Sequence, residues 1–109
     1  MQAVIVGPDR GIEAALADHD VETTRVEGLA TGESLDDAGL ADADLLVITD
    51  AAEATAVPVA KDRHPSIRIV FYTTDSVPEF VTGQLDLAVD PDLLSPDVVA
   101  EELVASISA

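Results

Sequence analysis

Short apolar runs that alternate with helical patterns are the feature of this sequence that most constrains its fold. Three runs are apolar almost throughout, and two more are mixed: one is half polar and the other nearly alternates. The apolar runs are Ala3–Val6, Leu45–Ile48 and Ile67–Phe71, and the mixed runs are Val21–Val26 and Leu85–Val89. Short runs bounded by Gly, Asp or Pro are typical of strands, and unbroken apolarity is typical of strands buried on both faces.

In chain order, helical patterns fill the two intervals between Ala3–Val6, Val21–Val26 and Leu45–Ile48. Ile12, Ala15 and Leu16 share one face of a helix. A short helix is expected over Glu33–Ala38, and Gly39 follows it as the residue that ends it. Each interval is therefore long enough for one helix between two strands.

The later intervals carry helix signals of a different kind. Another helix is expected over Glu53–Arg63, but Pro58 requires it to begin near Thr55 or to kink. Ser76–Glu79 has the pattern of a capping box ahead of a further helix. Ser95–Asp97 places a cap, a first-turn proline and an acid at the start of the last helix.

Strict alternation of strands and helices favours a parallel sheet covered on both faces, with right-handed crossovers. The two mixed runs belong at the sheet edges. Order 2-1-3-4-5 places both there, whereas order 3-2-1-4-5 would bury Val21–Val26 and expose Leu45–Ile48 at an edge. We therefore predict one domain over residues 1–109 with a three-layer α/β fold. It is an open five-stranded parallel sheet of order 2-1-3-4-5, Rossmann- or flavodoxin-like.

The charge balance restricts the partners and the setting of the protein. The chain has 22 acidic and 5 basic residues, for a formal net charge of −17. No Lys/Arg stripe is available for nucleic acid, and no apolar run approaches the ~20 residues of a membrane span. Charge repulsion of this size is screened in molar salt. With one lysine and three aromatic residues, the chain is predicted to be halophilic and cytoplasmic. An acidic protein of a mesophile is the alternative.

Residue types that build common catalytic and metal sites are scarce. The chain has no cysteine and two histidines, which excludes disulfides, thiolate nucleophiles and cysteine-based metal sites. His19 and His64 both fall at expected helix C-termini, where an imidazolium suits the helix dipole. No nucleophile–base pair can be named, so we assign no catalytic and no metal-binding residue, and an enzyme is the least favoured class.

Ligands of such folds bind at the carboxyl ends of the strands, near the switch point between strands 1 and 3. The loop Gly7–Gly11 follows strand 1, and glycines before a helix let backbone amides approach a phosphate. The dinucleotide fingerprint G-x-G-x-x-G is incomplete, because Asp9 and Ile12 occupy its second and third glycine positions. The alternative is a tight turn between strand and helix, capped by Asp9.

Two carboxylates could complete a nucleotide site at this edge. Glu27 follows Gly7 by 20 residues, where dinucleotide folds place the acid that binds a ribose. A solvated loop residue is the alternative for Glu27. Asp50 follows a buried strand and either meets the adenosine side of a ligand or caps the next helix.

The predicted strand order also fits domains that are phosphorylated on an aspartate. Such a site needs an acidic pair after strand 1, Asp after strand 3, Ser or Thr after strand 4 and Lys after strand 5. Asp50 and either Thr73 or Thr74 meet two of these requirements. Strand 1 instead ends in Gly7-Pro8, and strand 5 ends in Asp90-Pro91. A phosphorylation site of this type is therefore not expected.

From Gly28 onward the sequence resembles the TrkA-N or RCK nucleotide-binding domain of potassium-uptake regulators, in a shortened, stand-alone haloarchaeal form. The matching stretches are Gly28–Thr31, Leu35–Ala43, Asp44–Asp50, Glu53-Ala54 and His64–Val70, and Asp75, Glu79-Phe80 and Val89–Pro91 continue the register. One strand–helix unit between Gly11 and Gly28 is missing relative to that family. Its loss would convert the Rossmann order into 2-1-3-4-5.

The resemblance implies a regulatory function, since that family binds NAD(H), ATP or ADP and regulates ion transport, usually as dimers. The chain departs from the family at Leu29, in place of an acid, and at Tyr72, in place of an arginine. We expect a non-enzymatic regulatory module that binds a nucleotide (NAD, ATP, ADP or AMP) weakly. The candidate binding residues are Gly7, Asp9, Arg10, Gly11, Glu27, Ala30, Thr31 and Asp50. The alternative is a ligand-free subunit that pairs with itself or with another protein.

Overall fold

A five-stranded parallel sheet of order β2-β1-β3-β4-β5 forms the centre of the computed structural model, which describes residues 1–26 and 29–108. The strands are β1 Gln2–Val6, β2 Glu22–Val26, β3 Leu45–Ile48, β4 Arg68–Tyr72 and β5 Leu87–Val89. All four neighbouring pairs are parallel. The predicted α/β class and strand order are confirmed, and β2 and β5, which come from the two mixed runs, lie at the two edges.

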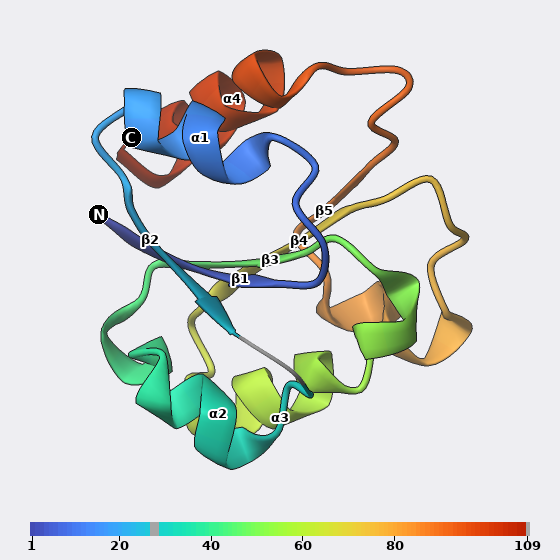
Figure 1. Cartoon of the computed structure of the whole chain (residues 1–109). Coiled ribbons are helices and arrows are strands. Elements are labelled where there is room, and N and C mark those ends of the chain that lie inside the picture. Colours follow the sequence, from blue (N-terminus) through green and yellow to red (C-terminus); the bar gives the residue numbers. More distant parts are fainter. Residues whose placement is uncertain (27–28, 109) are drawn as a thin grey trace.

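Helices cover both faces of the sheet (Figure 1). One face carries α1 (Ile12–Asp18) and α4 (Pro96–Ser108), and the other carries α2 (Gly32–Asp37) and α3 (Ala56–Arg63). Three short 3-10 helices complete the chain: η1 Leu40–Asp42, η2 Ala51–Glu53 and η3 Glu79–Gln84. None of the helices formed by the described residues has both the length and the apolar character needed to cross a bilayer.

The alternation of side chains along each strand divides the core into two clusters. In β3, Leu46 and Ile48 pack with α2 and α3, while Leu45 and Val47 pack with α1 and α4. All four side chains of β3 are completely buried, as the unbroken apolar run predicts. The inner strand β3 therefore presents no polar side chain, and the candidate residue Asp50 lies in the loop that follows it.

Two of the helix predictions meet different outcomes. Helix α3 begins after Thr55, so Pro58 lies in its first turn and no kink is needed; residues 51–53 form a separate 3-10 turn. The predicted capping box over Ser76–Glu79 is wrong. Pro78 has an extended backbone (φ −60°, ψ 138°), so the chain turns into a 3-10 helix only after it, with no side-chain cap.

Candidate functional site

The loop between β1 and α1 lies directly against the loop after β3. Gly7 has φ +108° and Gly11 has φ +85°. Residues other than glycine rarely adopt these backbone conformations. The Thr49 amide donates to the carbonyl of Val6 at 2.9 Å. After β1 the chain runs to α1 on one face, and after β3 it runs to α3 on the other (Figure 1). This is the switch point at which ligands of such sheets bind.

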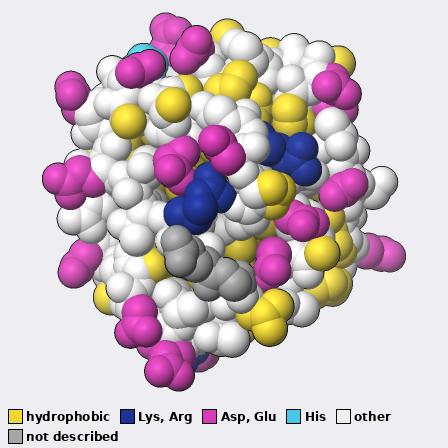
Figure 2. All heavy atoms as spheres, viewed as in Figure 1, with side chains coloured by type: hydrophobic (Ala, Val, Ile, Leu, Met, Phe, Trp, Pro, Cys, Tyr) yellow, Lys and Arg dark blue, Asp and Glu magenta, His cyan; other side chains and the backbone are white. Residues whose placement is uncertain are grey.

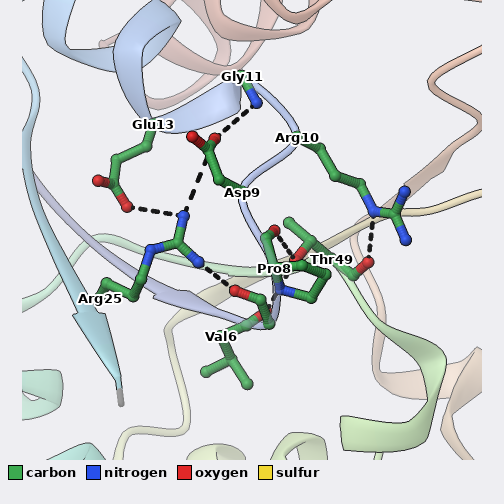
Figure 3. Close-up of polar contacts among 9 residues, drawn as sticks. Val6, Pro8, Asp9, Arg10, Gly11, Glu13, Arg25 and Thr49 are labelled. Carbon is green, nitrogen blue, oxygen red and sulfur yellow. Dashed lines mark hydrogen bonds and ion pairs between the residues drawn. The ribbon is translucent and has the colours of Figure 1, made fainter.

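Thr49 ties the two loops together from the inside. Its side chain is completely buried, and its hydroxyl donates to the Pro8 carbonyl at 2.6 Å. Arg10 reaches over from the first loop, and its Nε donates to the Thr49 carbonyl at 2.7 Å (Figure 3). The Pro8 carbonyl, the Thr49 hydroxyl and the Thr49 carbonyl therefore each have a hydrogen-bond partner.

Arg25 secures the same loop from the neighbouring strand β2. Its Nη1 donates to the Gly7 carbonyl. Its Nη2 lies 3.0 Å from Glu13 Oε1 and 4.0 Å from Asp9 Oδ1 (Figure 3). A single guanidinium thus joins the end of β1, the turn and the first turn of α1.

The Asp9 carboxylate uses the backbone amide of Gly11. Its Oδ1 accepts a hydrogen bond from the Gly11 amide at 2.8 Å. The carboxylate therefore lies at the start of α1, where the helix dipole favours a negative charge. Asp9 thus closes a tight turn ahead of α1, although α1 begins after Gly11 without a side-chain cap.

A shallow hollow of about 590 Å³ opens beside this turn. Three of the predicted binding residues line it: Gly7, Asp9 and Asp50. Asp50 also caps the following 3-10 turn, since its Oδ1 accepts from the Ala52 amide at 2.9 Å. Arg25 lines the hollow as well, and it is not among the predicted binding residues. The chain has only five basic residues, so an arginine near the end of a strand could have indicated Arg25 as a site residue.

The remaining predicted residues lie elsewhere. Arg10 turns away from the hollow toward Thr49. Ala30 packs against the core on the α2 and α3 side. Thr31 caps α2, because its hydroxyl accepts from the Ser34 amide at 3.1 Å. Glu27, the predicted ribose ligand, lies outside the described residues.

The ends of β4 and β5 complete this edge of the sheet. Thr73 is nearly buried, and its Oγ1 accepts from the Asp75 amide at 3.2 Å. Asp90 follows β5 and accepts from the Asp92 amide through Oδ1 at 2.8 Å. The strand ends therefore present Asp50, Thr73 and Asp90, while the end of β1 presents Gly7 and Pro8, which carry no carboxylate.

This fold is the one found in response regulators. An orphan response regulator of H. pylori is 19% identical, with a TM-score of 0.75, over 98% of this chain and 96% of that one. An atypical orphan response regulator, described as having a phosphorylation-independent regulatory mechanism, is 20% identical with a TM-score of 0.75, over 99% and 96%. A protein of Burkholderia thailandensis assigned to pilus assembly (cpaE) is 18% identical with a TM-score of 0.71, over 100% and 99%.

At this level of identity the likeness establishes the fold alone. By sequence, residues 3–103 match the family of unknown function DUF7126, and the chain belongs to that family. The comparison with curated proteins gave no match.

The inferred membership of the TrkA-N or RCK family is wrong. The matching family is DUF7126, and the solved structures of similar fold include response regulators rather than nucleotide-binding domains of potassium-uptake regulators. Part of the resemblance lay in Leu45–Ile48, a buried parallel strand that ends in a loop at the sheet edge, and strands of this kind occur in many α/β folds. No strand–helix unit has to be deleted to explain order 2-1-3-4-5, because the response regulator fold has that order already.

Proposed function

We propose that this protein is a non-enzymatic regulatory module that acts by contacting a partner protein, without a switch based on aspartyl phosphorylation. The observation that carries the proposal is the closed junction between β1 and β3. Thr49 donates to the Pro8 carbonyl at 2.6 Å, and Arg10 donates to the Thr49 carbonyl at 2.7 Å. A loop held in this way has its polar groups occupied.

The side chains at the strand ends support the same conclusion. Phosphorylation of an aspartate at this edge requires a Mg²⁺ ion, which prefers carboxylate oxygens. Gly7 and Pro8 stand where the acidic pair would be. Asp90 puts a negative charge where a lysine would pair with the phosphoryl group. Among the described residues, no group of three His, Asp or Glu side chains is placed to hold a metal ion.

A phosphorylation assay tests this proposal. The protein is incubated with Mg²⁺ and acetyl phosphate, and separately with Mg²⁺ and beryllium fluoride, alongside a response regulator with a complete site. We expect no phosphorylated species and no change in the amide NMR spectrum, while the control reacts. A phosphorylated species that disappears in Asp50→Asn would overturn the proposal.

Nucleotide binding at the hollow stays a prediction of the sequence. The hollow faces the carboxylates of Asp9, Asp50 and Glu53, and Arg25 is already paired with Glu13. These charges favour a ligand without a phosphate over a nucleotide. Thermal unfolding in molar KCl with NAD, ATP, ADP or AMP tests the point. Stabilisation that rises with nucleotide concentration would establish a site.

A further inference from the structure

An apolar groove of about 310 Å³ runs between the edge strand β5 and helix α4. Its walls include the aliphatic side chains of Val70, Leu87, Val89, Leu94, Val99 and Leu103. Leu87 is 37% exposed and Leu94 is 43% exposed. The groove lies at the sheet edge opposite β2, so it is separate from the hollow beside the β1–α1 turn. We call it the β5–α4 groove.

Exposed apolar side chains gather around the β5–α4 groove. Leu93 and Val98 lie in the segment between β5 and α4 and in the first turn of α4, and both are exposed. With Leu87 and Leu94 they make up four of the seven large apolar side chains exposed among the described residues. Grouped exposure of this kind marks interaction sites, whereas scattered single residues do not.

The charge around the β5–α4 groove is predominantly negative. From residue 69 to residue 109 the sequence has eight acidic residues and no Lys, Arg or His. Asp86 and Glu102 line the groove, and Arg68 is the single basic residue that does so. Elsewhere on the molecule, the face shown in Figure 2 carries many acidic side chains around a few basic ones near its centre. A second copy of the chain would bring the same excess of acid, and repulsion would oppose that pairing.

We propose that the β5–α4 groove binds a basic amphipathic helix of a partner protein. The inference rests on the proposed function as a module that contacts a protein. Apolar anchors spaced along one helix face would enter the groove, and Lys or Arg beside them would meet Asp86 and Glu102. A helix fits better than an added strand because β5 has only three residues and so offers a short edge.

Two synthetic helical peptides test the proposal against the full chain. One has leucines at the anchor positions with lysines elsewhere, and the other has the same leucines with glutamates. Binding is measured by fluorescence anisotropy. We expect the lysine peptide to bind and the glutamate peptide to fail. Leu87→Ser with Leu94→Ser should weaken binding roughly tenfold or more. Leu29→Ser, at a side chain 76% exposed on the side of α2, is the matched control and should have no effect.

Two charge-reversal variants distinguish binding in the groove from general attraction of a basic peptide to an acidic protein. Glu102→Lys lines the groove, whereas Asp62→Lys changes the net charge equally on α3. We expect only Glu102→Lys to weaken binding. Circular dichroism confirms that each variant folds.

Equal binding by every variant, or no binding of the lysine peptide, would overturn the groove proposal. So would a wild-type dimer that the Leu87 and Leu94 changes dissociate. The phosphorylation assay does not involve the groove, so the groove proposal and the proposed absence of aspartyl phosphorylation can fail separately.

Discussion

Gly7 and Thr49 approach so closely that a Cβ atom at Gly7 would lie 2.5 Å from the Thr49 hydroxyl oxygen. Real Cβ atoms essentially never come so near, so the glycine is needed for the contact as well as for its φ of +108°. The close approach brings the Thr49 hydroxyl to the Pro8 carbonyl. The closed junction between β1 and β3 therefore depends on the absence of a Cβ atom at Gly7.

Replacing this glycine should destabilise the protein more than replacing others. Gly7→Ala adds both backbone strain and the clash with Thr49, and we expect the free energy of unfolding to fall by about 3 kcal/mol. Gly39→Ala should cost about 1 kcal/mol, since Gly39 has φ +88° but open space around it. Gly83→Ala meets nothing within 4 Å and should change stability by less than about 0.5 kcal/mol. Urea unfolding of the three variants gives these values, and equal losses would refute the role of the contact.

Arg25 and Glu13 should be energetically coupled. Glu13 Oε1 is buried and accepts no hydrogen bond among the described residues, so the Arg25 guanidinium at 3.0 Å compensates its charge. Arg25→Met should lower the free energy of unfolding by about 2 kcal/mol. Both side chains are partly exposed, so we expect a coupling of only about 1 kcal/mol in a double-mutant cycle with Glu13→Gln. Strictly additive losses would show that the two residues act separately.

Tyr72 should make the protein sensitive to alkali. Burial raises the pKa of Tyr72 above its ordinary value of 10.0, so the unfolded chain loses this proton at lower pH than the folded protein. The free energy of unfolding is therefore unaffected by Tyr72 below pH 10.0 and falls as the pH rises beyond it. Tyr72 is the only tyrosine and the chain has no tryptophan, so tyrosinate absorbance reports it directly.

The control for this titration is Tyr72→Phe. The Tyr72 hydroxyl donates to the Leu94 carbonyl at 3.0 Å, so the variant should lose about 1 kcal/mol at neutral pH. It should also lose the extra decline that wild type shows above pH 10.0. A decline of the same size in both proteins would place the cause in other groups.

Salt should stabilise this fold strongly. The net charge of −17 repels itself at low ionic strength, and molar KCl shortens the screening length to roughly 3 Å. We expect the midpoint of thermal unfolding to rise steadily with KCl. Circular dichroism during dialysis checks this, and a fold that is indifferent to the removal of KCl would rule out the prediction of a halophilic protein.

The polarity of the strands was enough to predict the sheet. Val21–Val26 is half polar and lies at an edge, whereas Leu45–Ile48 is apolar throughout and lies inside. Burial on one face or on two is a property of each strand by itself, so it can be read locally. The end of α2 was also predictable from one residue, because Gly39 adopts the left-handed conformation that ends a helix, with φ +88°.

The site depended on contacts that local patterns do not contain. Thr49 meets Pro8 across 41 residues, and Arg25 meets Gly7 across 18. The spacing of glycines after β1 predicted a phosphate loop, but whether the Gly11 amide is free depends on where the Asp9 side chain turns. The sequence therefore indicated that the loop after β1 was a candidate site, but it did not indicate which residues contact one another there.

The packing of α1 against α4 has a consequence for how the chain is made. Ile12 and Leu16 belong to the same buried cluster as Val99 and Leu103. Because synthesis runs from the N-terminus, the ribosome makes the first pair long before the second pair. The apolar side of α1 therefore stays without its packing partner until α4 has been synthesised, and this half of the core can form only after that point.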